Sequence, residues 1–289
     1  MSDYPSPRVL LERHGLSAKR SWGQNFLADP GIAERFAAAA ELDPEDIVVE
    51  LGAGLGHLTA RLAERGGRVV AVERDRDLVR VLEAEFEDRP QVEVLAANAA
   101  TLDLADFTRR HGRPVVVVGN LPYQITSPIL FRLLDEWESL ARAVLGVQRE
   151  VADRLCASVG SRESGLLTVL LALRFERSSL FHIGPGAYTP RPRVASGVLR
   201  LTPFPAPAAE VPDEALFRQL VRAAFAQRRK TLRRALAADS TLLPDATSWI
   251  ELLRAAGVDH GRRGETLSIE EFARIAAVAA DARKPRGEG

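Results

Sequence analysis

The stretch of sequence that decides the fold is Ile47-Val48-Val49-Glu50-Leu51-Gly52-Ala53-Gly54-Leu55-Gly56. Its first half is a short apolar run, typical of a buried parallel strand. Glycines after such a strand let the backbone turn sharply and approach a ligand closely. They also leave N–H groups of the next helix free to meet polar atoms. The stretch therefore predicts a strand, a ligand-binding turn and a helix.

The alternation of strand and helix continues beyond this turn. Further strand patterns cover residues 68–73, 92–95, 115–118, 143–147 and 194–201, and helical patterns cover 58–64, 78–86 and 129–134. Alternation of this kind predicts a doubly wound α/β sheet of the Rossmann-like type.

A proline-rich segment marks the end of the alternating pattern. Prolines stand at positions 203, 205, 207 and 212, a composition typical of a linker. Beyond them the pattern is helical only, including residues 214–238 and 269–282. We therefore expect a catalytic α/β domain over residues 1–205 and a small all-helical domain over residues 206–289.

Composition excludes several classes of protein. The chain has 289 residues, 46% of them hydrophobic, with 39 basic and 39 acidic side chains. No apolar run approaches the roughly 20 residues that a membrane span needs. Cys156 is the one cysteine, and the five histidines do not have metal-ligand spacing. We expect a cytoplasmic monomer without a metal and without a membrane anchor.

An acidic residue is placed to complete a nucleotide site. Glu73 ends the second strand pattern, 21 positions after Gly52, where a carboxylate can accept hydrogen bonds from two ribose hydroxyls. A Gly-x-Gly-x-x-Gly turn would favour a dinucleotide, whereas this chain has Gly-x-Gly-x-Gly, which is common in S-adenosylmethionine folds. The pattern predicts a cofactor that contains adenosine; the alternative is an ordinary tight turn.

The segment Asn120-Leu121-Pro122-Tyr123 follows the valine strand directly, and ligands bind at the carboxyl ends of strands in such sheets. The lone pair of an adenine amine is delocalised into the ring. Two acceptors on its N–H groups, the Asn120 side chain and the Leu121 carbonyl, would free that lone pair. Pro122 would rigidify the turn, and Tyr123 would stack on the purine for about 1–3 kcal/mol. The alternative is a turn ordered by its proline.

Two further segments mix aromatic and basic residues. Residues 19–27, Lys-Arg-Ser-Trp-Gly-Gln-Asn-Phe-Leu, precede a helical pattern, and a basic segment before a capped helix explains them equally well. Residues 188–194, Tyr-Thr-Pro-Arg-Pro-Arg-Val, can place Tyr188 as the second face of an aromatic sandwich around a flipped-out base. The alternative for this second segment is an edge hairpin.

Positions 215–238 contain seven basic residues and no acidic one. If one helix covers this region, Arg218, Arg222, Arg229 and Arg233 fall within about 60° of arc. The absence of an acid in the segment favours contact with phosphate over a merely solvated face. The predicted RNA-binding residues are Arg218, Arg222, Arg228, Arg229, Lys230 and Arg233.

Together these segments resemble the ribosomal RNA adenine dimethyltransferase family, from about Arg8 to Phe272. The motifs that carry the resemblance are Gly-Gln-Asn-Phe-Leu at 23–27, Glu-Leu-Gly-x-Gly-x-Gly at 50–56, Gly-Asn-Leu-Pro-Tyr at 119–123 and Gln-Arg-Glu-Val at 148–151. Within the family, residues 188–194, residues 225–232 and the Asn120-Leu121 pair look like the small-subunit branch.

The resemblance implies an S-adenosylmethionine-dependent enzyme that adds two methyl groups to each of two adjacent adenosines near the 3′ end of small-subunit (16S) rRNA. The implied catalytic residues are Asn120, Leu121, Pro122, Tyr123 and Tyr188. The implied cofactor-binding residues are Asn25, Leu27, Gly52, Gly54, Gly56, Glu73, Asn98 and Asn120. The family usually has aspartate at position 98, so the amide here predicts weaker cofactor binding.

Three alternatives to this activity stay open. The first is a large-subunit (23S) rRNA methyltransferase of the macrolide-resistance type, and the second is a ribosome assembly factor whose catalysis is dispensable. The third, an oxidoreductase, is disfavoured because the chain lacks the pattern of a hydride-transfer site.

Overall fold

The structure, a computed structural model, describes residues 4–243 and 248–283. By packing, the chain divides into two compact units. The first comprises Met1–Asp153 and Arg177–Pro203, and the second comprises Arg154–Glu176 and Phe204–Gly289. The second unit thus begins close to the expected boundary after residue 205, and it also includes a segment that precedes the last strands of the sheet.

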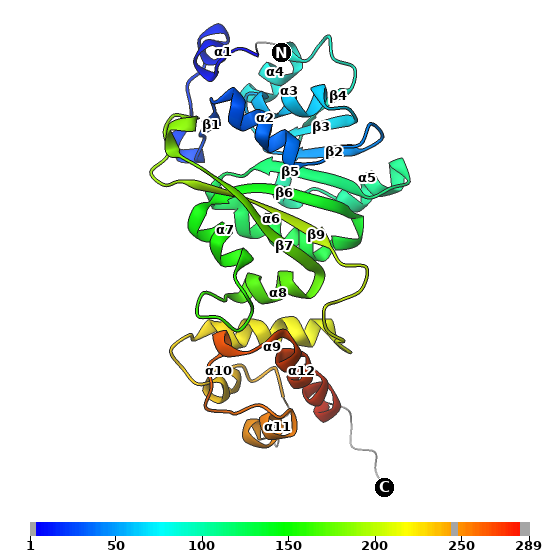
Figure 1. The fold of residues 1–289 in the computed structure, drawn as a ribbon, viewed down its shortest axis with the longest axis vertical. Helices are drawn as coiled ribbons and strands as arrows, with labels where there is room; N and C mark the ends of the chain where they lie inside the picture. The colour runs from blue at the N-terminus through cyan, green and yellow to red at the C-terminus, as the bar shows by residue number, and fades with distance from the viewer. Residues whose placement is uncertain (1–3, 244–247, 284–289) are drawn as a thin grey trace. The chain divides into compact units, whose positions relative to one another are not determined.

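A mixed sheet is the centre of the first unit (Figure 1). Within the described residues it has seven strands in the order β4-β3-β2-β5-β6-β9-β7. Strands β4 to β6 run parallel, and β9 pairs antiparallel with β6. The α/β prediction is confirmed. The strands are β2 (Ile47–Leu51), β3 (Arg68–Glu73), β4 (Val92–Ala96), β5 (Val115–Asn120), β6 (Leu140–Gln148), β7 (Phe175–Ile183) and β9 (Ser196–Pro203).

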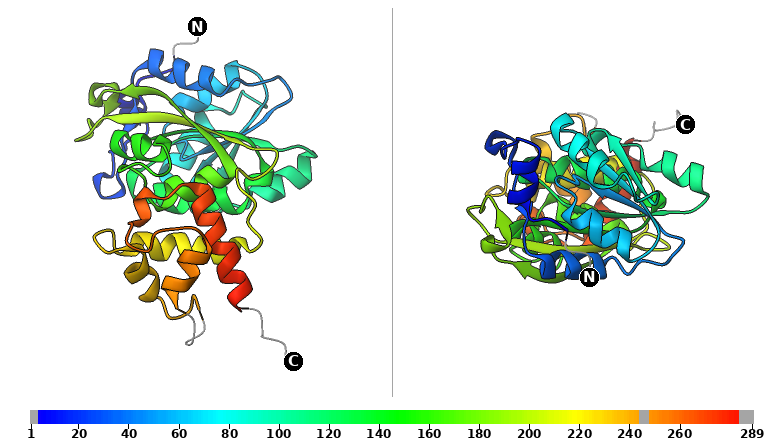
Figure 2. Two further views of the ribbon diagram at one scale, coloured as in Figure 1. Left: turned by 60° about the horizontal axis from the view of Figure 1, so that its bottom comes forward. Right: turned by 90° about the horizontal axis from the view of Figure 1, so that it is seen from above.

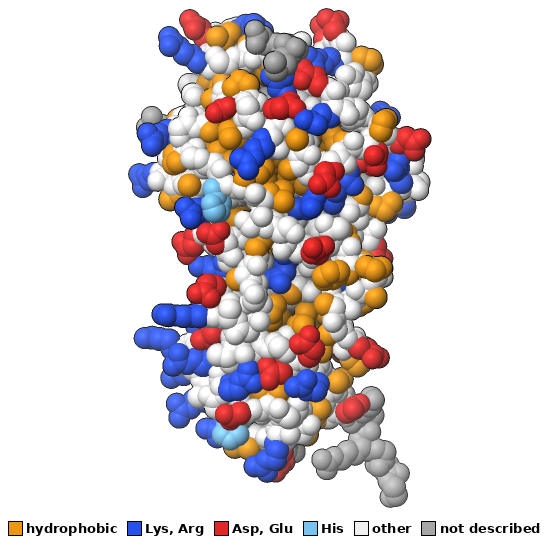
Figure 3. All heavy atoms as spheres, viewed as in Figure 1, with side chains coloured by type: hydrophobic (Ala, Val, Ile, Leu, Met, Phe, Trp, Pro, Cys, Tyr) orange, Lys and Arg blue, Asp and Glu red, His pale blue; other side chains and the backbone are white. Residues whose placement is uncertain are grey.

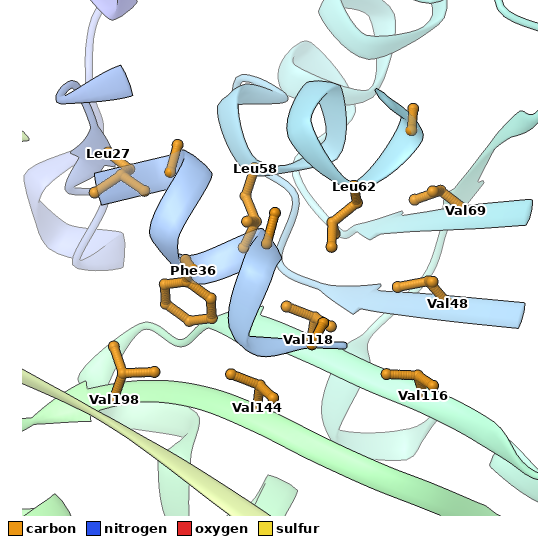
Figure 4. Packing of buried hydrophobic residues seen from close by; sticks show 14 of the residues in the cluster. Leu27, Phe36, Val48, Leu58, Leu62, Val69, Val116, Val118, Val144 and Val198 are labelled. Carbon is orange, nitrogen blue, oxygen red and sulfur yellow. The ribbon is translucent and has the colours of Figure 1, made fainter. Parts of the chain in front are cut away.

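Helices cover both faces of this sheet (Figures 1 and 2). They are α2 (Pro30–Ala39), α3 (His57–Glu64), α4 (Arg76–Glu85), α5 (Leu104–His111), α6 (Thr126–Asp135) and α7 (Arg149–Cys156), and α1 (Pro7–Arg13) packs through Leu10 against Leu78 and Val81 of α4. On one face, Phe36 of α2 and Leu58 of α3 pack against strand valines such as Val118 (Figure 4). Each fully buried side chain of this size contributes about 1.5–3 kcal/mol, so this core holds the strand ends in place.

The order of the strands creates a crevice at the middle of the sheet. From β2 the chain continues to β3 and β4 on one side, and β5 and β6 lie on the other side. Loops that leave β2 and β5 therefore diverge, and ligands bind at such switch points. The turn after Leu51 follows β2, and the turn after Asn120 follows β5, so both lie at this switch point.

Two distant segments meet beside this crevice. The short strand β1 (Phe26–Leu27) pairs antiparallel with β8 (Tyr188–Thr189), with Leu27 opposite Tyr188. The two aromatic and basic motifs of the sequence, separated by about 160 residues, are therefore joined by a backbone ladder.

The second unit is helical in its described residues. Its helices are α8 (Leu166–Arg174), α9 (Glu214–Ala226), α10 (Leu232–Ala237), α11 (Trp249–Ala255) and α12 (Ile269–Arg283). Around α9 the core is aromatic: the Phe272 ring lies 6.5 Å from that of Phe217 and 6.3 Å from that of Phe225.

The prediction of one helix over residues 214–238 is wrong, because α9 ends at Ala226 and α10 begins at Leu232. The N–H group of Leu232 donates to the Arg262 carbonyl at 2.6 Å, and the N–H of Arg233 donates to the His260 carbonyl at 3.3 Å. These bonds replace those of a continuous helix.

Neither membrane spans nor metal clusters occur in the described part of the chain. None of the helices there combines the length and apolar character of a membrane span. Residues 4–243 and 248–283 also contain no group of three or more His, Cys, Asp or Glu side chains arranged to hold a metal ion.

Candidate methyl-transfer site

A pocket of about 1090 Å³, including its open mouth, lies at the crevice of the first unit. It brings together nearly all the residues predicted to bind the cofactor or the base. Its walls include Asn25, Leu27, Gly52, Gly54, Glu73, Asn98, Asn120, Leu121, Pro122, Tyr123 and Tyr188. The pocket connects the glycine turn with the Asn120 turn, as a methyl transfer between two ligands requires.

The three glycines of the glycine turn have different surroundings. Gly52 and Gly54 line the pocket with φ angles of 76° and 61°, which favour glycine. Gly56 does not line the pocket. A Cβ there would lie 2.5 Å from Phe86 Cε2 and 2.6 Å from the Tyr4 hydroxyl, so this position packs against the end of α4 and against Tyr4.

Glu73 is fixed by backbone groups at the pocket wall. Its Oε2 accepts from Gly54 N at 3.0 Å, and its Oε1 accepts from Arg74 N at 2.8 Å and Asp75 N at 2.9 Å. Burial raises the pKa of this carboxyl, and the three backbone donors oppose that rise. The carboxylate is held in one orientation, as recognition of a ribose diol requires.

Two titratable pocket residues were not singled out from the sequence. Glu50 is 2% exposed, and burial raises its pKa to about 8 although Thr59 Oγ1 donates to its Oε2 at 2.5 Å. Burial lowers the pKa of His57 to about 4. In the sequence, Glu50 and His57 stand on either side of the glycine turn. A titratable residue next to such a turn is the signal that could have marked them as pocket residues.

The N-terminal arm, residues 19–27, is tied to the loop that follows Glu73. Lys19 Nζ lies 2.7 Å from Asp75 Oδ1, and Gln24 Nε2 donates to Asp75 Oδ2 at 2.8 Å. Trp22, which is 39% exposed, lines the pocket with the Arg74 guanidinium 4.4 Å from its ring centroid. These contacts hold the segment that brings Asn25 and Leu27 to the pocket wall.

The Asn120 turn is pinned at both ends. Leu121 N donates to the Gly146 carbonyl at 2.9 Å, and Ile125 N donates to the Pro122 carbonyl at 3.1 Å. A Cβ at Gly146 would lie 2.9 Å from Phe36 Cε2 and 3.0 Å from Asn120 Oδ1, so the glycine on the neighbouring strand gives this amide room.

The two predicted base-stacking tyrosines differ in exposure. Tyr123 is half-buried at the pocket, whereas Tyr188 is 4% exposed and belongs to the core that contains Phe36. The Tyr188 hydroxyl lies 3.3 Å from Asn120 Oδ1 and 3.0 Å from Ser196 Oγ. With its ring in the core, Tyr188 meets the site chiefly through its hydroxyl.

Asn98 lines the pocket just after β4. The residue is exposed, and its Oδ1 caps a short 3₁₀ helix by accepting from Ala100 N at 3.1 Å. An amide oxygen has a second lone pair, so the same atom can accept a further bond from a ligand.

The basic residues of the second unit form an edge at the end of α9 and the start of α10. We call Arg222, Arg228, Arg229, Lys230 and Arg233 the basic edge; all but the partly buried Arg233 are exposed. Figure 3 shows Lys and Arg side chains gathered at the lower left of the view. Arg218 differs, because Glu214, one residue before the acid-free segment, accepts from it at 2.9 Å.

The strand order, the glycine turn with its acid and the pocket that reaches Asn120 define a class: a Rossmann-like methyltransferase that uses S-adenosylmethionine. Within that class the chain belongs to the ribosomal RNA adenine dimethylase family, whose sequence model matches residues 15–281.

The similarity to known proteins extends over nearly the whole chain. "Ribosomal RNA small subunit methyltransferase A" of Anaeromyxobacter sp. (strain K) is 52% identical over 94% of this chain and 97% of its own length. The protein of the same name from Pelotomaculum thermopropionicum is 45% identical over 95% and 96%. Among solved structures, the 23S rRNA methyltransferase ErmE has a TM-score of 0.67 and 27% identity over 89% of this chain and all of its own. A dimethyladenosine transferase from Plasmodium falciparum has a TM-score of 0.72 over 89% and 98% at 22% identity, which supports the fold.

Proposed function

We propose that this chain transfers methyl groups from S-adenosylmethionine to the N6 amines of two adjacent adenosines near the 3′ end of small-subunit rRNA. The observation that carries the proposal is one pocket that joins the glycine turn, Glu73 and the Asn120 turn. The names of the relatives with 45–52% identity favour the small subunit as substrate. We further propose a cytoplasmic monomer that acts during subunit biogenesis.

The pocket has the groups that S-adenosylmethionine needs. Glu73 would accept from the ribose hydroxyls, the glycine turn would allow close backbone approach, and Asn25, Leu27 and Asn98, which line the same pocket, would contact the remainder. The cofactor supplies an electrophilic methyl group on a sulfonium when it is bound. The protein's contribution is to exclude water and hold the target amine in line with that methyl group.

At the other end of the pocket, two oxygens act on the target amine. Asn120 Oδ1 and the Leu121 carbonyl accept hydrogen bonds from its two N–H groups. These bonds draw the nitrogen toward tetrahedral geometry and free its lone pair. Tyr123 offers a ring on which the purine stacks. After transfer the nitrogen is acidic enough to lose its proton to water, so placed dipoles suffice without a general base.

The basic edge supplies the RNA contacts of the second unit. Its five cations bind phosphates without reading sequence, which orients the substrate and makes affinity dependent on salt. We keep Arg218 among the proposed RNA-binding residues, although its pairing with Glu214 makes it the weakest candidate.

The direct test is incubation of the purified protein with unmethylated small subunits and methyl-labelled S-adenosylmethionine, followed by mapping of the labelled base. We expect N6-methylated adenines in small-subunit rRNA. Label in large subunits instead would favour the resistance-type activity. Binding of small subunits without label would favour a pure assembly factor.

A further inference from the structure

Four side chains of the first unit form one continuous hydrogen-bonded row. Tyr123 Oη lies 3.3 Å from Ser196 Oγ, Ser196 Oγ lies 3.0 Å from Tyr188 Oη, and Tyr188 Oη lies 3.3 Å from Asn120 Oδ1. Asn120 ends β5, Tyr123 lies in the turn after it, Tyr188 belongs to β8, and Ser196 begins β9. Ser196 and Tyr188 are 2% and 4% exposed, so they bond to protein groups rather than bulk water.

The direction of this row follows from the number of hydrogens. Each hydroxyl carries one hydrogen, so Tyr188 can donate to only one of its two neighbours. Asn120 Oδ1 is an acceptor only, and therefore the bond between them needs the Tyr188 hydrogen. The Tyr188 hydroxyl has two acceptors within reach, Asn120 Oδ1 and Ser196 Oγ. In the arrangement where it donates to Asn120, Ser196 donates to Tyr188 and Tyr123 donates to Ser196.

We propose that Ser196 and Tyr188 are positioning residues that fix the orientation of the Asn120 amide. This inference rests on the proposed function. The bond from Tyr188 occupies one lone pair of Oδ1 and leaves the other for the target amine. An inverted amide would present N–H groups to that amine and compete for the lone pair that must attack the methyl group. Burial raises the pKa of Tyr188 to about 12, so the hydroxyl keeps its hydrogen at neutral pH.

The test compares Ser196→Ala, Tyr188→Phe and their double variant. Each single change should lower kcat by about tenfold, the size of effect expected when a buried polar group loses a partner. The Kd for S-adenosylmethionine and the KM for subunits should stay within about twofold. Because both residues act through one row, the double variant should be no slower than the slower single variant.

Two further variants separate positioning from general damage. Tyr123→Phe keeps the stacking ring and removes only the far end of the row, so kcat should fall less than about threefold. Ser196→Thr keeps the hydroxyl and should recover most of the Ser196→Ala loss. Melting temperatures identify any variant that fails to fold.

A readout independent of turnover is the side-chain amide signal of Asn120 in NMR spectra, assigned by its loss in Asn120→Ala. It should shift in Ser196→Ala and Tyr188→Phe even if no rRNA is methylated, which separates this inference from the proposed function. Unchanged amide signals, or kcat losses that multiply in the double variant, would overturn the role of the row.

Discussion

Side chains in the pocket of the first unit are held by other protein groups, whereas the cations of the basic edge mostly extend into solvent. The carboxylate of Glu73 accepts three backbone N–H bonds, and Asn120 Oδ1 lies within bonding distance of Tyr188. In contrast, Arg229 and Lys230 are exposed and lie between two helices.

This difference matches the chemistry asked of each region. Methyl transfer requires the reacting groups to be positioned to within about 0.5 Å and 10–20°, so these groups need fixed orientations. Phosphate binding depends on charge and tolerates movement, because the attraction has little directional preference. Substitutions of the pocket groups that face the target amine should therefore change kcat, and substitutions in the basic edge should change the affinity for subunits.

The largest expected effect is that of Asn120→Ala. Loss of an acceptor that acts in the transition state should lower kcat by about 10²–10³-fold, as for a missing oxyanion-hole donor. Subunit binding should remain, because the basic edge is intact. Single-turnover methylation and filter binding measure the two quantities. The control is Ser127→Ala, an exposed residue of α6; full activity of Asn120→Ala would contradict the assignment.

The basic edge should show the opposite response. Arg228→Gln together with Arg229→Gln should raise the KM for subunits about tenfold and reduce the slope of log K against log salt by roughly 1.4–1.8, with kcat unchanged. The matched control removes the same charge from α5 through Arg109→Gln and Arg110→Gln, where both side chains pair with Asp106. Equal losses in the two double variants would show that only net charge matters.

Buried Glu50 makes the pocket sensitive to pH. Its pKa is about 8 in the folded protein against 4.5 for an ordinary carboxyl, so between these values the unfolded chain ionises while the folded chain keeps the proton. The stability that Glu50 contributes is fully present below about pH 4.5 and is lost as pH rises through about 8.

Glu50→Gln cannot ionise and still accepts from Thr59. Its melting temperature relative to the unmodified protein should therefore rise by roughly 10 °C between pH 5 and pH 9, since a pKa difference of this size corresponds to several kcal/mol and 1 kcal/mol to about 2–4 °C. Glu93→Gln removes an exposed carboxylate paired with Arg68 and should show no such trend. A melting-temperature difference that does not change with pH would refute the burial argument.

The regularity of a region decided how much of it the sequence predicted. Strands β2 and β3 have the bounds expected from their apolar runs, because both are buried on two faces. The helix break at residue 227 was missed, because the partners of the next helix start are remote in the sequence: Leu232 and Arg233 donate to the carbonyls of Arg262 and His260. Ser196 had no sequence signal, because its importance comes from two tyrosines that are distant in the chain or on another strand.

The smallest expected effect concerns Asn98, where the pocket meets solvent. The residue is exposed, and its oxygen already caps the turn at Ala100. An aspartate keeps the cap and adds a charge, which strengthens a hydrogen bond from the cofactor's adenine amine. Because solvent screens that charge, Asn98→Asp should tighten S-adenosylmethionine binding only about threefold, measured by calorimetry with kcat unchanged. Weaker or equal binding would mean that this position contacts the cofactor only through its backbone, and that the fixed carboxylate of Glu73 carries the recognition of the nucleoside.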